Sequence, residues 1–324
     1  MGAYKNLMLV FSVYLIFYAC IGFCVQPVMH SKGAMFLLFV DSFFKDYQQL
    51  SIILLSIYVG TFGLCISVLA AHFFYRYLAI CHPTNLFYLE GFKLLKIYIP
   101  GILMSSIWSL GVYIMLKPTE VKSNLLSEAL LLAYDIDIYH TPYISLLYYH
   151  RGPTKKLIIN WGDWSIFLLA VTIMGTCIIT MIICGLNCYN ALEKVSNISR
   201  RTKDLNRQLF RTLIVQTLVP FCTLFTPVAV LFTIPIFSIE LGTLANAPGL
   251  YLSIYPALDA LIVIFMIKDF REILLCRHRK PDIAMTSTFN DATKIPRSYK
   301  FKENSIKSTA SVLNSESQPK QKCI

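Results

Sequence analysis

Long stretches without a charged side chain alternate with short polar segments along this chain. A helix needs about 20 mostly apolar residues to cross a hydrocarbon core of about 30 Å. Six stretches are long enough, and prolines within them are tolerated because neighbouring helices can satisfy the freed backbone groups. The pattern predicts an all-α membrane protein, a helical bundle with spans at residues 7–29, 52–80, 97–116, 164–192, 212–236 and 241–267.

The pattern changes after the sixth stretch. In "KDFREILLCRHRK", apolar side chains recur at helical spacing among basic ones, which predicts a short amphipathic helix at residues 268–280 on the inner leaflet. Cys276 in this helix is either palmitoylated or an unmodified thiol. Residues 281–324 are rich in Ser, Thr, Lys and Asn and predict a disordered cytoplasmic tail. The transmembrane domain is therefore predicted to be residues 1–280.

Composition and charge agree with this interpretation. Hydrophobic residues make up 56% of the chain and charged residues 15%, with a mean hydropathy of +0.59, outside the usual range for a soluble protein. Cytoplasmic loops carry an excess of Lys and Arg. The loop 193–211 and the C-terminal tail show this excess, whereas the loop between the fifth and sixth spans has neither residue. Both chain ends are therefore predicted inside, and residues 30–51 and 117–163 outside.

The net charge of +11 and the ten cysteines exclude several other functions. Most of the positive excess lies on the predicted cytoplasmic side, which indicates membrane lipids or an acidic cytoplasmic partner and not nucleic acid. No outer loop contains a cysteine, so the cysteines predict small apolar packing residues and not a disulfide framework. They lack an accompanying histidine cluster, and we expect no metal and no cofactor.

The second span carries a stripe of small residues. Ser56, Gly60, Gly63, Ser67 and Ala71 recur every three or four positions, so they share one helix face and allow neighbouring backbones to approach closely. We expect this helix to be central in the bundle.

Two polar residues follow at the cytoplasmic end of the same span. His72 and Arg76 are four residues apart and share a helix face. Arg76 has two interpretations: an anchor whose charged group extends to the cytoplasmic membrane surface, as the positive-inside rule favours, or an arginine held in the inner mouth of the bundle for a partner.

The sixth span contains one acid, Asp259, on the same face as Tyr255 and separated from it by Pro256. A carboxylate in the membrane costs about 2.5–3.5 kcal/mol at its centre, so it needs compensation. Asp259 is predicted to have either a functional role or a structural hydrogen bond to a neighbouring helix.

Three motifs resemble a known family. "HFFYRYLAICHP", "RQLFRTLIVQTLVPF" and "YPALDALIVIFMIKDFR" are similar to the inner end of helix three, the start of helix six and the end of helix seven in the Str class of nematode serpentine chemoreceptors. The resemblance extends from "YKNLMLVFSVY" near the start to about residue 280. It implies a rhodopsin-like bundle and a G-protein-coupled receptor for small volatile or soluble chemicals, in the plasma membrane of sensory neuron cilia.

The resemblance also implies residue roles. Coupling to a heterotrimeric G protein and activation would involve the inner ends of the second and fifth spans, and a helix-seven switch would lie in the sixth span. A ligand would enter from outside and be covered by the tyrosine-rich loop 117–163, although no ligand-binding residue is identified. The implied coupling residues are His72, Tyr75, Arg76, Tyr77, Arg200, Arg201, Arg207 and Arg211, and the switch residues are Tyr255, Pro256 and Asp259.

The chain departs from the family pattern in two places, and it differs from rhodopsin-like receptors in a third. The "YKNLM" motif follows the first membrane helix in the family but begins here at Tyr4, so the six spans match family helices two to seven. Ala260 replaces the proline that usually follows the acid, and a gentler bend in the sixth span would follow. Tyr75 stands where rhodopsin-like receptors carry an acid, so their local salt bridge to the arginine is not expected here.

Two other functions remain open at this point. Six helices with both ends inside would also suit a transporter or channel, but only Asp259 is an ionisable midplane residue and no internal repeat is seen. A truncated receptor without function is the second alternative. An enzyme is not expected, because Asp163, His140 and His150 in or beside one outer loop have no nucleophile or metal spacing around them.

Overall fold

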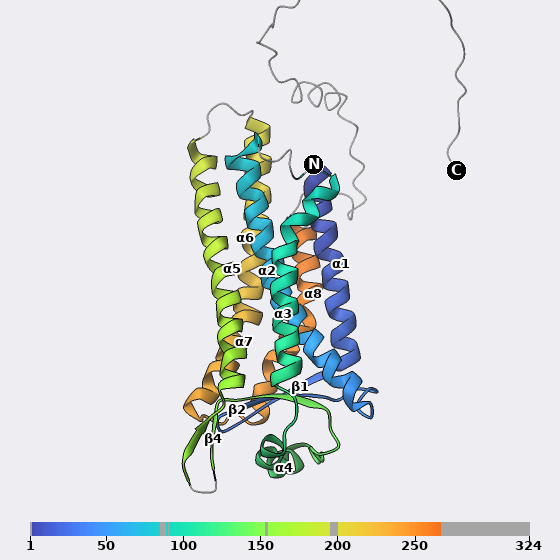
Figure 1. Cartoon of the computed structure of the whole chain (residues 1–324). Helices are drawn as coiled ribbons and strands as arrows, with labels where there is room; N and C mark the ends of the chain where they lie inside the picture. Colours follow the sequence, from blue (N-terminus) through green and yellow to red (C-terminus); the bar gives the residue numbers. More distant parts are fainter. Residues whose placement is uncertain (1, 85–88, 90, 153–154, 195–199, 267–324) are drawn as a thin grey trace, which may run out of the picture. The chain divides into compact units, whose positions relative to one another are not determined.

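Long apolar helices run side by side through most of the chain, and short strands lie at one end of them (Figure 1). The computed structural model describes residues 2–84, 89, 91–152, 155–194 and 200–266, all within one compact unit that comprises residues 1–276. The predicted amphipathic helix 268–280, Cys276 and the tail 281–324 lie outside the described residues. The helices are α1 (Gly2–Val25), α2 (Gln48–Cys81), η2 (Gly91–Tyr98), α3 (Ile99–Met115), α4 (Glu120–Tyr134), α5 (Trp161–Lys194), α6 (Arg200–Pro220), η3 (Phe221–Phe225), α7 (Thr226–Thr233), η4 (Ile234–Phe237), η5 (Thr243–Asn246) and α8 (Ala247–Met266).

Five helical segments of the described chain are long and apolar enough to cross a membrane, and they coincide with the first five predicted spans. The sixth predicted span, 241–267, contains α8, which packs against α1 and α6. Its crossing of the membrane stays a prediction. The five segments are Asn6–Val25, Gln48–Cys81, Lys93–Met115, Trp161–Glu193 and Phe210–Phe237.

Two spans differ in detail from the prediction. The first helix ends at Val25 and not at residue 29, because Gln26 adopts a left-handed φ of 43° and Pro27 starts a strand. The fifth span is not one regular helix: α6, the π-helical segment η3 and α7 follow one another around Pro220 and Pro227. Proline removes a backbone donor, and π segments commonly absorb such irregularities.

Helix α2 is the centre of the bundle, as its small residues predicted. In its most apolar window 72% of residues are buried, against 22% for the spans of α3 and α5. The stripe contacts α3: the Ser109 hydroxyl donates to the Ser56 carbonyl at 2.8 Å, and a Cβ added at Gly60 would lie 2.6 Å from Ser109 Cβ. The close approach of these two backbones therefore requires glycine at position 60.

Two small antiparallel sheets correct the expectation of a purely helical protein. Strands β1 (Pro27–Lys32), β2 (Met35–Val40) and β3 (Tyr143–Leu147) form one sheet in the order β1-β2-β3, and β4 (Tyr149–Arg151) pairs with β5 (Leu157–Ile159). The β1–β2 hairpin turns at Gly33, whose φ of +53° suits glycine. The strands come from segments that were expected to be outer loops.

The three-stranded sheet is covered on both faces. Phe36, Leu38 and Val40 of β2 pack toward the helical bundle, and the alternate residues Leu37 and Phe39 pack with α4. Strand β2 is therefore buried along its whole length, which explains its continuous apolar sequence "MFLLFV". We call this sheet together with α4 the lid.

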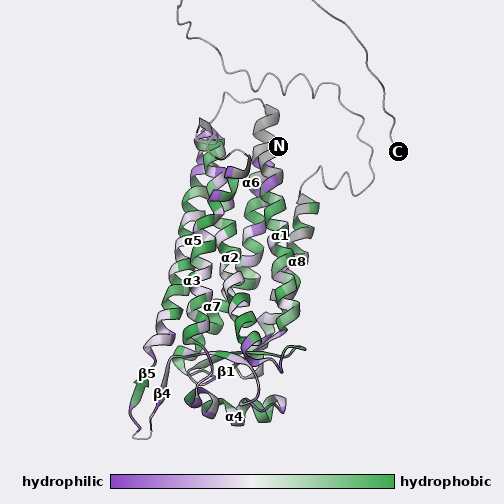
Figure 2. Cartoon of the chain, turned by 45° about the vertical axis from the view of Figure 1, so that its right-hand side comes forward, coloured by the Kyte–Doolittle hydropathy of each residue, from purple (hydrophilic) through white to green (hydrophobic). Residues whose placement is uncertain are grey.

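The lid and the β4–β5 hairpin lie at the same end of the helices, the end to which the outer loops were assigned (Figure 1). We call this the outer end and the opposite one the inner end. Figure 2 shows that hydrophobic residues dominate the middle of the helices and that hydrophilic residues gather near the inner helix ends and in the lid. This distribution is typical of a bundle surrounded by lipid.

Candidate functional site

An apolar pocket lies directly beneath the lid. Its roof consists of β2 and β3, and its walls come from α2, α3, α5 and α7. The space not occupied by atoms is about 410 Å³, which includes solvent space at the open mouth. The residues used below are Val59, Trp108, Ile144, Leu146, Ala170 and Phe232.

Trp108 provides the indole ring in the pocket wall. Only 3% of its surface is exposed, and a Cβ added at Gly63 would lie 2.7 Å from Trp108 Cε3. The bare backbone of α2 at Gly63 therefore makes room for one edge of the indole ring. Among the described residues, the buried Nε1 atom of Trp108 has no hydrogen-bond partner.

Two tyrosines tie the end of the lid to α7 and η4. The Tyr148 hydroxyl donates to the Phe232 carbonyl at 2.5 Å, and the Tyr149 hydroxyl donates to the Ile236 carbonyl at 3.0 Å. Burial raises the pKa of Tyr148, so its hydroxyl stays a donor. Phe232 of α7 also lines the pocket. The same residue therefore contributes to the pocket wall and accepts the hydrogen bond from Tyr148 at the end of β3.

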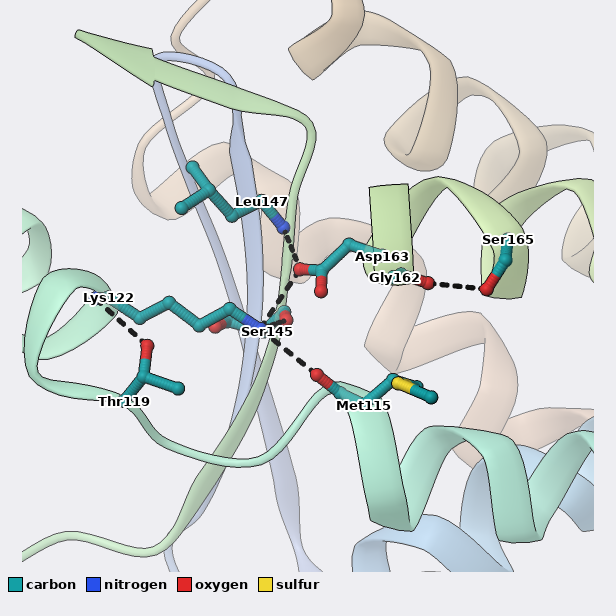
Figure 3. A network of polar contacts seen from close by, with 8 residues as sticks. All are labelled: Met115, Thr119, Lys122, Ser145, Leu147, Gly162, Asp163 and Ser165. Carbon is teal, nitrogen blue, oxygen red and sulfur yellow. Dashed lines mark hydrogen bonds and ion pairs between the residues drawn. The ribbon is translucent and has the colours of Figure 1, made fainter. Parts of the chain in front are cut away.

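A buried ion pair fastens the lid to the bundle (Figure 3). Lys122 Nζ of α4 lies 2.9 Å from Asp163 Oδ2 of α5, and both side chains are 2% exposed. The same ammonium group donates to the Ser145 carbonyl of β3 at 2.9 Å, and the same carboxylate oxygen accepts from the Leu147 amide at 2.7 Å. The pair thus joins α4, β3 and the first turn of α5.

The electrostatics of this pair follow from burial. Desolvation lowers the pKa of Lys122, while the Asp163 carboxylate beside it opposes that shift. The carboxylate lies at the N-terminus of α5, where the helix dipole favours a negative charge. Each charge therefore has a partner and further polar contacts, which buried ion pairs require.

This contact was not predicted from the sequence, in which Lys122 and Asp163 both fall within the expected outer loop 117–163. A signal was present, because Lys122, Leu126 and Leu130 are spaced by four and lie on one buried face of α4. A lysine that continues an apolar helix face indicates a buried partner. The expected partner is an acidic residue in the first turn of a helix, where the helix dipole favours a negative charge, and Asp163 occupies such a position.

The predicted coupling residues of α2 lie at the inner end. His72 Nε2 and the Tyr98 hydroxyl are 2.9 Å apart, and the His72 ring also meets Phe11 edge-on, so this histidine links α2 to η2 and α1. Tyr75 and Arg76 are buried, with Arg76 6% exposed, and the Tyr77 hydroxyl lies 2.9 Å from His82 Nε2.

The arginines of α6 approach the same end. Phe73 of α2 meets Phe210 of α6 edge-on, with ring centroids 6.4 Å apart. Arg207 and Arg211, on either side of Phe210, have exposed side chains. Arg200 and Arg201 belong to the first turn of α6, but their side chains lie outside the described residues.

The predicted switch residues lie in α8. The Tyr255 side chain is 1% exposed, and the Cys65 thiol of α2 donates to its hydroxyl at 3.7 Å. Pro256 lies within the helix. Asp259 belongs to α8 as well, but its side chain lies outside the described residues.

Metal and disulfide chemistry find no support in the part of the chain that the structure describes. It holds no group of three or more His, Cys, Asp or Glu residues arranged for a metal ion, and its eight cysteines are free. His140 of the outer loop contacts Asp137 at 2.7 Å, with both side chains exposed.

Comparisons with known proteins agree with this arrangement. Residues 1–275 match the family model of the serpentine type 7TM GPCR chemoreceptor Str. The chain is 30% identical over 302 residues to serpentine receptor class r-10 of Caenorhabditis elegans, covering 91% of this chain and 88% of that protein. It is 30% identical over 287 residues to the protein of the same name from Caenorhabditis briggsae, with coverage of 87% and 84%.

A further relative is the G-protein coupled receptor str-33 of Caenorhabditis elegans, 26% identical over 281 residues, covering 83% of this chain and 79% of that protein. The match to the family model covers the spans, the lid and the inner helix ends together. The chain is thus a multi-pass membrane protein that belongs to the Str family of serpentine seven-transmembrane chemoreceptors.

Proposed function

We propose that this receptor binds a small, neutral and largely apolar molecule in the pocket beneath the lid and signals to a heterotrimeric G protein from its inner end. The observation that carries the proposal is the apolar pocket itself, which is roofed by β2 and β3 and lined almost entirely by apolar side chains. Membership of a chemoreceptor family supports the same function.

A continuous structural connection between the two ends supports signalling. Phe232 contributes to the pocket wall and belongs to α7, which continues through η3 into α6. A ligand that favours one position of Phe232 would shift the balance between two positions of this irregular span. Its inner end carries Arg207 and Arg211 as exposed groups for an acidic partner surface.

The inner ends of α2 and α6 are proposed as the coupling surface. His72, Tyr75, Arg76 and Tyr77 would hold α2 against its neighbours at rest, and separation of α6 would uncover Arg76. The burial of Arg76 supports a covered resting state. Arg200 and Arg201 are proposed to extend the surface, and Tyr255, Pro256 and Asp259 to form the helix-seven switch.

The remaining expectations belong to this proposal. The receptor is placed in the plasma membrane, in sensory neuron cilia, with its basic residues against anionic inner-leaflet lipids. Cys276 is a proposed palmitoylation site.

Filling the pocket tests the proposal. Ala170 is 2% exposed and lines the pocket, so Ala170→Leu should occupy ligand space and lower the ligand-evoked G-protein response at least tenfold, with surface expression retained. Ala229→Leu is the matched control, because Ala229 lies on α7 with an exposed side chain. The measurement is a second-messenger response in transfected cells screened with a panel of small volatiles.

Two outcomes would contradict the proposal. Equal responses of Ala170→Leu and the wild-type receptor would show that the ligand does not bind in this pocket. Uptake of a compound or an ion current without any G protein would instead indicate a transporter or channel.

A further inference from the structure

The pocket contains an unused hydrogen-bond donor. Of the described residues that line it, only Trp108 and Ser145 have polar side chains. Ser145 alternates along β3 with Ile144 and Leu146, which pack toward the bundle, so its side chain points to the α4 face with Tyr143 and Leu147. Trp108 is therefore the lining residue whose side chain carries a polar group on the bundle side of the roof.

The orientation of the indole directs its N–H away from α2. The Cε3 and Cζ3 atoms face Gly63, at 2.7 and 2.8 Å from a Cβ added there. Nε1 lies on the opposite edge of the ring system. The packing of the benzo edge against Gly63 therefore directs the N–H away from α2. This atom is buried and lacks a partner among the described residues.

Formal charges are absent from the walls that the structure describes. Lys122 of the lid is engaged by Asp163 and by the Ser145 carbonyl on the α4 side of the roof. A charged ligand would therefore enter an apolar space without a counter-charge, which is strongly unfavourable. A pure hydrocarbon would leave the buried indole N–H unsatisfied, which is also unfavourable.

We propose that the ligand is a compact neutral molecule with one hydrogen-bond acceptor, a carbonyl or ether oxygen, that accepts from Trp108 Nε1–H. This inference rests on the proposed function and adds the chemistry that selects the ligand. Apolar contacts with residues such as Val59, Ala170 and Phe232 hold the rest of the molecule, and the single donor fixes its direction.

Matched compounds of nearly equal shape test the proposal. Dipropyl ether and heptane differ by one oxygen in place of a methylene group, and 4-heptanone and 2-propyl-1-pentene differ by a carbonyl in place of a methylidene group. In cells expressing the wild-type receptor, each oxygen compound should act at a half-maximal concentration about 3- to 10-fold lower than its hydrocarbon partner, as one neutral hydrogen bond implies.

Substitution of the indole by a similar ring without a donor is the second arm. Trp108→Phe should bring each pair to equal potency by weakening the oxygen compounds more than the hydrocarbons. Trp161→Phe is the matched control, because Trp161 is 75% exposed and lies outside the pocket, and it should retain the wild-type preference. Surface staining reports the amount of each variant at the membrane.

The outcomes separate this inference from the proposed function. Three outcomes would overturn the acceptor assignment but leave ligand binding in the pocket intact. They are equal potency within both pairs in the wild-type receptor, activity of the hydrocarbons alone, and equal weakening of all compounds by Trp108→Phe. The wild-type receptor could also respond to other compounds, lose this response in Ala170→Leu and respond to neither oxygen compound. That result would likewise overturn the acceptor assignment. If Trp108→Phe did not reach the surface, the wild-type comparison would still decide.

Discussion

At the inner end of α2, two buried polar side chains illustrate what single residues contribute. His72 has a hydrogen bond to Tyr98 and an aromatic contact with Phe11, and thus acts as a link between three helical segments. Arg76, one turn further along, is 6% exposed, although an arginine can usually extend its charged group to water. A surface anchor would extend its charged group to water, so the burial of Arg76 supports the proposed role in activation.

Arg76→Ala should abolish ligand-evoked signalling and leave surface expression unchanged, because the proposed partner contact is lost and α2 remains packed. The measurement compares the second-messenger response with antibody staining of unpermeabilised cells. Arg151→Ala, at an exposed arginine of the outer hairpin, is the control. Parallel loss of signalling and expression would assign Arg76 a purely structural role.

At the scale of elements, the lid depends on a contact between α4 and α5. The sheet has one face on the bundle and one on α4, and the Lys122–Asp163 pair lies where β3 meets both helices (Figure 3). A buried ion pair is strongly destabilised when one partner alone is removed, because the other charge stays uncompensated. The pair therefore fixes the position of the pocket roof.

Lys122→Met should cost about 3–5 kcal/mol and clearly lower the melting temperature of the purified receptor in detergent. The double variant Lys122→Met with Asp163→Asn should recover much of this loss, since no lone buried charge remains. His140→Ala, which breaks the exposed pair with Asp137, should have almost no effect. A double variant as unstable as the single one would show that the charges do not act as a pair.

At the scale of the whole bundle, the outer and inner ends carry different chemistry. The pocket and lid lie at one end, whereas His72 follows Val59 by 13 positions on α2, a separation of about 20 Å along the helix. The proposed ligand pocket and the proposed coupling surface are therefore separate sites, and a rearrangement of helices would have to connect them. The orientation of the bundle in the membrane rests on its basic loops.

An epitope inserted next to Arg200 should be stained only in permeabilised cells, because basic loops stay in the cytosol. The same epitope at Gly152, in the β4–β5 hairpin, should be stained on intact cells. Gly152 lies outside the paired strand residues, and Arg200 is the first residue of α6, so insertions at these positions should leave the bundle intact. Staining of the Arg200 epitope on intact cells would reverse the topology and remove the proposed coupling surface.

The sequence by itself determined the helical bundle and its central helix. Uncharged stretches of bilayer length and the small residues from Ser56 to Ala71 are local properties, and they act without reference to distant parts of the chain. The family was also readable, since its motifs are continuous segments such as "HFFYRYLAICHP". The exposure of Arg207 and the burial of Arg76 could not be read from the sequence, because both depend on neighbouring helices.

Only the tertiary structure decided the lid, the pocket and its donor. Strand β3 joins β2 from a distant part of the chain, and Lys122 meets Asp163 across the same fold. The spacing of Lys122, Leu126 and Leu130 indicated a buried face. No local signal identified the partner of the strand or of the lysine, because the burial that makes these pairings favourable exists only after the helices have assembled. The direction of the Trp108 N–H likewise follows from its contact with Gly63 on another helix.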